Sequence, residues 1–136
     1  MLEKTAFNAP DGQPYQLIHL TNSEDMTVQF MDWGATWLSC KVPVNSELRE
    51  VLLGCKVEDY PHQTAYLGVS VGRYANRIAN AKFELGERTI QLVENQGKHQ
   101  LHGGKEGFDK RRWALKKCGE NLKYLASEIH FKKFAD

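Results

Sequence analysis

The sequence lacks the features that mark several large classes of protein. None of its apolar stretches approaches the roughly 20 residues that a membrane-spanning helix needs. Its three cysteines are widely spaced and contain no C-x-x-C pair, so they support neither a zinc knuckle nor a disulfide framework. The first five residues have no apolar segment of the kind found in secretory signals. These absences predict a reduced, cytoplasmic protein.

A strong charge of either sign is also missing. The formal net charge is +1 at pH 7, so a strongly basic nucleic-acid-binding protein is not expected. The distribution is uneven, because the part from residue 98 onward is basic and the part before it is acidic. A basic tail is typical either of a surface for an anionic partner or of an ordinary solvated face, and both interpretations remain open. The 136 residues, 41% hydrophobic and 26% charged, fit one globular domain.

Where hydrophobic residues are present, they mostly repeat with period two, which indicates β-strands. We expect strands at residues 15–20, at 26–31, and at 38–42 with an end at Pro43. The apolar runs at residues 50–55 and 66–71 are expected to be further strands. Strands separated by turn signals about every dozen residues predict an antiparallel sandwich or barrel.

The clearest local prediction is a hairpin over residues 83–93. Phe83 and Leu85 precede Gly86-Glu87, and further apolar residues follow in alternation. Glycine at the first of two turn positions suits a type II′ turn, which would pair Phe83 with Ile90; a longer, bulged turn is the alternative. Residues 95–109 are rich in glycine and are predicted to form a long loop. A strand is expected to begin at Trp113, and the part from Leu122 is ambiguous.

Two stretches carry residues suited to chemistry. The first, GRYANRIAN at residues 72–80, places two arginines and two asparagines directly after an apolar run. Arginine offers five fixed donors and asparagine offers both a donor and an acceptor, a combination that suits polyol recognition. A surface loop in which an arginine binds backbone carbonyls is the structural alternative.

The second stretch, LHGGKEGFDK at residues 101–110, places His102 beside two glycines. Histidine titrates near neutral pH, and neighbouring glycines permit close approach of a ligand. A histidine that simply hydrogen-bonds within a tight turn is the alternative. His99 and His102 are three residues apart, but the glycines disfavour a helix and no third ligand has suitable spacing, so no metal site is expected.

Taken together, these motifs resemble those of the aldose 1-epimerases, also called galactose mutarotases. The matching motifs are GRYANRI (72–78), LHGG (101–104), GFDK (107–110) and Trp113, with DWGA (32–35) and LGC (53–55) before them. The resemblance covers roughly residues 10–117 in a consistent order. It implies an all-β fold, a large antiparallel β-sandwich of the galactose mutarotase-like type that binds a hexose in an open cleft.

The resemblance also implies the reaction, interconversion of the α and β anomers of free hexoses such as galactose and glucose. A general base and a general acid open the ring, the C1–C2 bond rotates, and the ring closes on the other face. No metal and no organic cofactor is implied. Asn76 and Arg77 match the family's sugar-contacting pair, and His102 matches its first active-site histidine, near the ring oxygen. Arg73 matches the motif too, with a structural role as its alternative.

The chain also departs from the family. The second histidine, the sugar-binding aspartate and the glutamate base come from the family's C-terminal half, and no residue here matches them. Residues 118–136 read as a divergent tail. The resemblance thus implies one incomplete sandwich domain over residues 1–136, truncated or frame-disrupted, weakly active or inactive alone, and prone to self-association. Two other functions remain open: a non-catalytic carbohydrate-binding module, and a relative that acts on hexose 6-phosphates.

Overall fold

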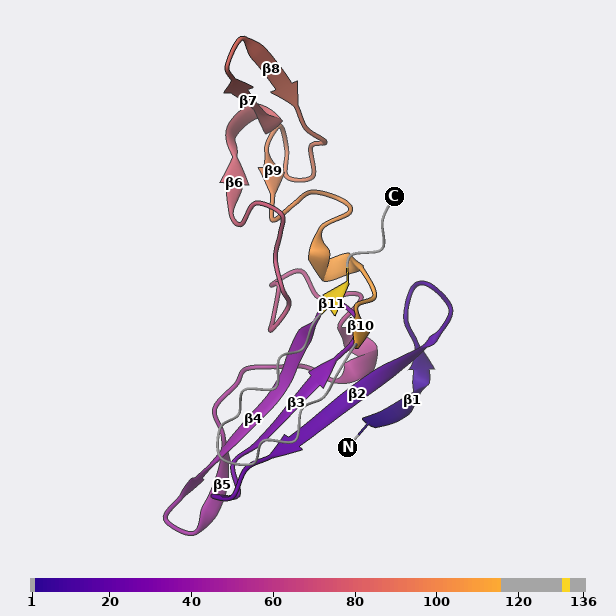
Figure 1. Ribbon diagram of the computed structural model, residues 1–136, viewed down its shortest axis with the longest axis vertical. Coiled ribbons are helices and arrows are strands. Elements are labelled where there is room, and N and C mark those ends of the chain that lie inside the picture. The colour runs from indigo at the N-terminus through magenta and orange to yellow at the C-terminus, as the bar shows by residue number, and fades with distance from the viewer. Residues whose placement is uncertain (1, 116–130, 133–136) are drawn as a thin grey trace.

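The computed structural model describes residues 2–115 and 131–132, and its largest unit is a five-stranded antiparallel sheet. Each strand pairs with the next in the chain, in the order β1-β2-β3-β4-β5, and Figure 1 shows them side by side. The strands are β1 (Leu2–Asn8), β2 (Pro14–Thr21), β3 (Thr27–Met31), β4 (Thr36–Val44) and β5 (Glu47–Glu50). This meander is the scaffold to which the rest of the described chain is attached.

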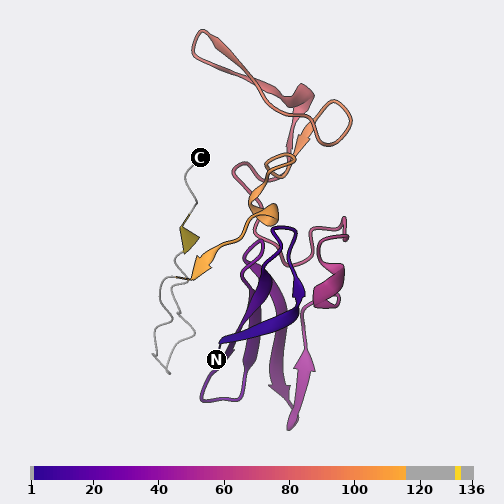
Figure 2. The same ribbon diagram turned by 90° about the vertical axis from the view of Figure 1, so that its right-hand side faces the viewer.

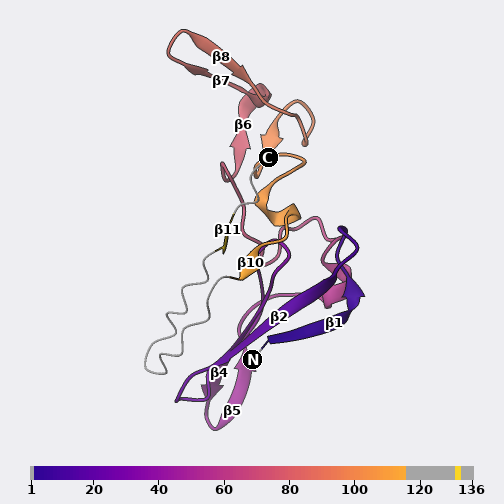
Figure 3. The same ribbon diagram turned by 45° about the vertical axis from the view of Figure 1, so that its right-hand side comes forward.

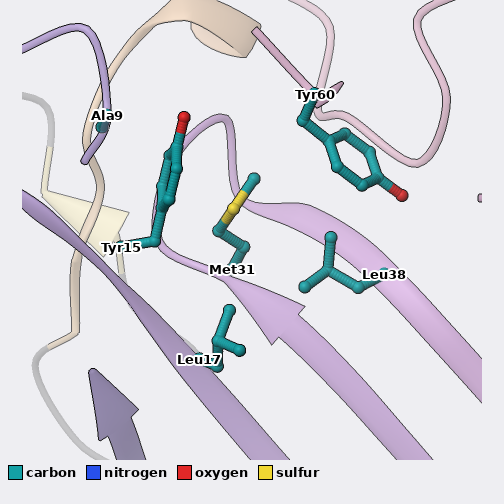
Figure 4. Packing of buried hydrophobic residues seen from close by; sticks show 6 residues of the cluster. All are labelled: Ala9, Tyr15, Leu17, Met31, Leu38 and Tyr60. Carbon is teal, nitrogen blue, oxygen red and sulfur yellow. The ribbon is translucent and has the colours of Figure 1, made fainter. Parts of the chain in front are cut away.

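One face of β2, β3 and β4 carries the hydrophobic core. The 3-10 helix η1 (Val57–Asp59) and the residues after it lie beside that face (Figure 2). Figure 4 shows the buried cluster, which consists of Ala9, Tyr15, Leu17, Met31, Leu38 and Tyr60. Tyr15 and Met31 are fully buried, and burial of such side chains stabilises a fold by roughly 1.5–3 kcal/mol each. The core therefore fixes the loop from η1 onward against the sheet.

The second part of the chain forms an arm that leads away from the sheet (Figures 1 and 3). It contains two antiparallel pairs, β6 with β9 and β7 with β8, and a third pair, β10 with β11, follows it. The strands are β6 (Arg77–Ile78), β7 (Lys82–Leu85), β8 (Arg88–Gln91), β9 (Gln100–Leu101), β10 (Ala114–Leu115) and β11 (Phe131–Lys132), with 3-10 helices η2 (Ala79–Ala81) and η3 (Phe108–Lys110). The residues of the two chemistry-bearing stretches lie in this arm.

The structure confirms the antiparallel all-β prediction and several of its elements. Strands β2 and β4 contain the segments expected at residues 15–20 and 38–42, and β3 begins one residue into the segment expected at 26–31. Strand β10 begins one residue after Trp113. The β7–β8 hairpin pairs Phe83 with Ile90 around a two-residue turn, and Gly86 has φ of 60°. That positive φ is the conformation that the first position of a type II′ turn requires.

The strand expected at residues 50–55 is wrong. Strand β5 instead lies in the polar segment before it and pairs with the end of β4. Asn45 and Ser46 connect the two strands with φ of 51° and 67°, the left-handed pair that a type I′ hairpin turn uses. The turn therefore sets the register, and the ladder ends with the hydrogen bond from Val51 N to Cys40 O (2.9 Å), so the rest of the apolar run lies outside it. Pro43 does not end β4, which continues to Val44, because proline removes only one donor near the strand end.

The strand expected at residues 66–71 is also wrong. This segment crosses the start of β4 and makes isolated backbone hydrogen bonds, in which Trp37 N donates to Gly68 O (2.8 Å) and Ser70 N donates to Gly34 O (2.9 Å). Tyr66 has φ of 56°, which interrupts an extended conformation. The apolar character of the run reflects packing against the sheet, since Leu67 contacts the core cluster.

The loop predicted at residues 95–109 contains the short strand β9, which sequence periodicity could not indicate from two residues. Strand β1 was not predicted, because its side chains are almost all exposed and do not alternate. The expected divergence of residues 118–136 and the ambiguous segment from Leu122 fall almost wholly outside the described residues. Among the described residues, no helix is long and apolar enough to cross a membrane.

Candidate functional site

Pairing of β6 with β9 brings the two chemistry-bearing stretches together. The register places Arg77 opposite Leu101 and Ile78 opposite Gln100. The residues just outside this pair, Asn76 and His102, therefore face each other across the same ladder. All three predicted site residues lie at this one end of the β6–β9 pair.

Asn76 and His102 are joined by two reciprocal hydrogen bonds. The backbone N–H of His102 donates to the carbonyl oxygen of Asn76 at 3.0 Å. The backbone N–H of Asn76 donates to ring atom Nδ1 of His102, also at 3.0 Å. Both residues have positive φ, 65° for Asn76 and 51° for His102. The ring is thus oriented by the backbone that precedes Arg77.

Arg77 is held by polar neighbours while its side chain stays exposed. Its Nε donates to Gln96 Oε1 at 2.6 Å, and its Nη1 donates to Asn76 Oδ1 at 3.2 Å. A guanidinium has five donors, so these two contacts leave others free for a ligand. Gln96 was not identified from the sequence, and nothing in its local pattern distinguishes it from other loop glutamines.

Tyr66 is a second neighbour that sequence reasoning missed. Its ring lies 4.5 Å from the imidazole of His102, centroid to centroid, with the two planes tilted by 60°. Burial raises the pKa of the Tyr66 hydroxyl, and the nearby charge of Asp109 raises it further. Tyr66 therefore packs against one side of the histidine that Asn76 orients.

The glycines beside His102 are required by close packing. Gly103 has φ of 88°, and a Cβ atom there would overlap the carbonyl oxygen of Gly72. The same Gly72 oxygen accepts a hydrogen bond from the backbone N–H of Phe108 at 3.2 Å. Gly72, at the start of the first stretch, therefore packs against Gly103 and Phe108 of the second stretch. Arg73 lies 5.5 Å from the centre of the Phe108 ring, a cation–π contact that agrees with the structural alternative for this residue.

Asp109 is a buried carboxylate next to this assembly. Its side chain is only 9% exposed, and its Oδ1 has no hydrogen-bond partner among the described residues. Burial raises the pKa of the Asp109 carboxyl, and the positive charges of Lys110 and His102 partly offset that effect. Lys110 Nζ lies 3.9 Å from the other oxygen. Burial and the absence of a hydrogen bond to Oδ1 both disfavour ionisation of Asp109.

The two histidines considered as a metal pair serve another purpose. His99 Nδ1 accepts a hydrogen bond from the backbone N–H of Asn80 at 3.1 Å, as His102 Nδ1 does from Asn76. In the described part of the chain, no three His, Cys, Asp or Glu side chains converge as metal ligands.

An open hollow of about 740 Å³ adjoins the site. Its lining includes Tyr66, Gln96 and Asp109, the neighbours of the predicted residues, together with Trp33 and Tyr60 from the sheet end. The described residues that line the hollow do not include Asn76, Arg77 or His102. The three predicted residues therefore lie outside the hollow, although Gln96, which contacts Arg77, and Tyr66, which contacts His102, line it.

Arg112 anchors the end of the arm to the sheet, a role that no sequence pattern indicated. Its Nε and Nη2 donate to the two oxygens of Asp11 at 2.6 and 2.8 Å. Its Nη1 donates to Asp32 and to Pro14 O, and its Nη2 donates to Gln13 O. Asp32 is buried in the turn that the DWGA motif (32–35) forms.

Comparison with known proteins places these features in one family. The family model described as aldose 1-epimerase matches residues 16–133 of the chain. The aldose 1-epimerase of Haemophilus influenzae is 74% identical over 122 residues, which is 90% of this chain and 36% of that protein. The aldose 1-epimerase of Escherichia coli is 54% identical over 117 residues, which is 85% of this chain and 34% of that protein.

A solved structure agrees with the sequence relationship. The galactose 1-epimerase from Lactobacillus acidophilus superposes with a TM-score of 0.72 and 27% identity, over 88% of this chain and 35% of that one. This chain thus spans about a third of the length of these relatives. The match of sequence along most of the chain, together with the match of fold, shows that the chain belongs to the aldose 1-epimerase family.

Proposed function

We propose that this chain supplies the hexose-recognition part of an enzyme that interconverts the α and β anomers of free aldohexoses such as galactose. Asn76, Arg77 and His102 are the residues proposed to contact the sugar. The observation that carries the proposal is their convergence at one end of the β6–β9 pair, with Asn76 and His102 bonded reciprocally at 3.0 Å. The family relationship supplies the reaction class.

The chemistry of the three side chains suits a sugar. A hexose presents a ring oxygen and several hydroxyl groups, which accept and donate hydrogen bonds. Arg77 provides positively charged donors at an exposed position, and Asn76 provides an amide beside it. When the ring opens, negative charge develops on the ring oxygen. A fixed guanidinium close to that oxygen stabilises this charge in the transition state.

Turnover needs two proton-transfer groups on opposite sides of the reacting centre. In the described residues, Asp109 is the carboxyl group whose charge interacts with His102, but its side chain is only 9% exposed and so offers little access to a sugar hydroxyl. We therefore assign recognition to this chain and place the general base in the part of the family fold that it does not span. Sugar binding with little or no turnover is the expected behaviour of these 136 residues.

Calorimetry and polarimetry of the purified chain test this proposal. Titration with D-galactose is expected to show saturable binding that His102→Ala weakens by about tenfold, the effect of losing roughly 1.4 kcal/mol of hydrogen bonding. Arg88→Ala, which changes an exposed arginine of the β7–β8 hairpin, is the matched control and is expected to bind like the parent chain.

Polarimetry of freshly dissolved α-D-galactose distinguishes recognition from catalysis. Mutarotation at the spontaneous rate agrees with the proposal that this chain binds the sugar but lacks the general base. Rapid mutarotation that disappears in His102→Ala would show that the chain holds a complete catalytic site. Absence of saturable binding to galactose and to glucose would refute the recognition role itself.

A further inference from the structure

A backbone amide donates a hydrogen bond to the ring of His102, and this bond determines which ring nitrogen carries the proton. A backbone N–H can only donate, so the ring atom that receives it must carry a lone pair. The Asn76 N–H donates to Nδ1 of His102 at 3.0 Å. In the neutral imidazole only one nitrogen carries hydrogen, so the proton is then on Nε2.

The same arrangement occurs twice along the β6–β9 pair. Asn80 has φ of 54°, like Asn76 at 65°, and its N–H donates to Nδ1 of His99 at 3.1 Å. Asparagine tolerates this left-handed conformation better than most residues, which turns the amide toward the facing strand. An asparagine with positive φ that donates its backbone N–H to a histidine ring therefore occurs at two places in this strand pair.

The two copies differ in their surroundings. His102 also donates its own backbone N–H to Asn76 O at 3.0 Å, and its ring contacts Tyr66 at 4.5 Å between centroids. The His99 backbone instead bonds to the turn formed with Gln96. Asn76 and Tyr66 therefore constrain the His102 ring at two positions, whereas no described residue hydrogen-bonds to its Nε2.

We propose that the backbone amide of Asn76 is a positioning group that fixes His102 as the Nε2–H tautomer, so that Nε2 donates a hydrogen bond to a sugar oxygen. The inference rests on the proposed hexose-binding function and assigns the direction of one of its hydrogen bonds. Tyr66 limits rotation of the ring about this bond. A donor at Nε2 matches an oxygen acceptor, and the ring oxygen of a hexose can only accept.

Nitrogen NMR of the full chain, labelled with ¹⁵N-histidine, tests the tautomer directly. At a pH about two units above the ordinary histidine pKa, all neutral rings report which nitrogen is protonated. His102 and His99 are expected to show a protonated Nε2 and an unprotonated Nδ1 far downfield of it. His62, an exposed residue for which no ring hydrogen bond is recorded in the structure, provides the averaged reference pattern. An averaged pattern for His102 in the parent chain would overturn the proposal.

Matched variants of the two asparagines identify the responsible amide. Asn76→Gly keeps the N–H and permits positive φ, so His102 is expected to keep its pattern. Asn76→Val disfavours positive φ, so both His102 nitrogens are expected to shift toward the His62 pattern. Asn80→Val is expected to shift His99 and leave His102 unchanged. Loss of the fixed tautomer in Asn76→Gly, or its persistence in Asn76→Val with the β7–β8 hairpin signals intact, contradicts the proposal.

A galactose titration of the same labelled chain separates this inference from the function on which it rests. The expected result is a shift of the His102 Nε2 resonance, with a smaller change at Nδ1. If backbone signals at Arg77 respond to galactose while His102 Nε2 does not, sugar recognition stands and the assigned donor is wrong. If no signal responds, the recognition role fails, whereas the tautomer measurement keeps its own result.

Discussion

At the scale of single residues, two charged groups near the site differ in how they are compensated. Arg112 donates to two carboxylates and to two carbonyl oxygens, so its charge is matched by partners on several segments. Asp109 is almost completely buried and leaves one oxygen without a hydrogen bond among the described residues. Arg112 is therefore expected to stabilise the fold, whereas the buried Asp109 carboxyl is expected to destabilise it.

Arg112→Lys is expected to lower the free energy of unfolding by about 2 kcal/mol, because lysine cannot reproduce the paired bonds to Asp11. Urea denaturation measures the change. Arg111→Lys is the matched control, since Arg111 is exposed and pairs with the exposed Glu106, and its effect is expected to stay within about 0.5 kcal/mol. Equal effects of the two substitutions would mean that the Arg112 network does not hold the arm.

Asp109→Asn is expected to raise stability at neutral pH by about 1 kcal/mol, because it removes the ionisable form that burial penalises. The pKa of the folded Asp109 carboxyl is raised, so its protonated form favours folding at low pH and this contribution is lost as the pH rises through the folded pKa. The gain from the substitution should therefore shrink as the pH falls through that same value. Thermal melts across pH measure it, and a gain that grows toward low pH would contradict the assignment.

At the scale of elements, structure set by neighbouring residues was predicted correctly more often than structure set by contacts between distant segments. The β7–β8 hairpin was predicted to its register, because Gly86 and the flanking alternation define it within ten residues. The run at residues 66–71 was misassigned, since its apolar side chains pack on the sheet and its backbone bonds to residues some 30 positions away. Proximity of Asn76 and His102 likewise depends on the pairing of β6 with β9, which was not predicted; the family resemblance implied only that both residues contact the sugar.

The loop after β9 tests how tightly the site is built. Gly103→Ala is expected to cost about 2–3 kcal/mol and to weaken galactose binding, because a Cβ there overlaps the Gly72 carbonyl in addition to the strain of positive φ. Gly97→Ala is the control: it also has positive φ, at 55°, but its Cβ would meet no atom within 4 Å, so a cost of about 1 kcal/mol is expected. Denaturation and calorimetry compare them. Equal costs would show that crowding against Gly72 is unimportant.

At the scale of the whole molecule, apolar side chains remain uncovered in the described part of the chain. Leu53 is 78% exposed and Leu85 is 63% exposed, and β1 and β5 form the two edges of the main sheet. Exposed apolar patches and open strand edges are typical of surfaces that another segment or molecule covers. The family resemblance led us to expect self-association, but it did not identify which side chains are exposed.

Self-association of the isolated chain follows from these surfaces. Sedimentation velocity is expected to show species larger than the 15.5 kDa chain, in proportions that rise with concentration. Leu53→Lys with Leu85→Lys is expected to shift the distribution toward the monomer. Glu87→Lys alters charge in the β7–β8 hairpin, which contains Leu85, without removing an apolar group. It is expected to change the distribution of species little. A monodisperse monomer with a sharp cooperative melt would be inconsistent with this expectation.

Asn76, Arg77 and His102 are proposed to form one hexose-recognition site. Backbone amide shifts recorded during a D-galactose titration test it most directly, with the parent chain, Arg77→Ala and Arg88→Ala compared. Saturable shifts are expected at all three residues and at Gln96. They should be lost in Arg77→Ala and retained in Arg88→Ala. Shifts confined to other parts of the chain, or shifts that survive Arg77→Ala unchanged, would contradict it.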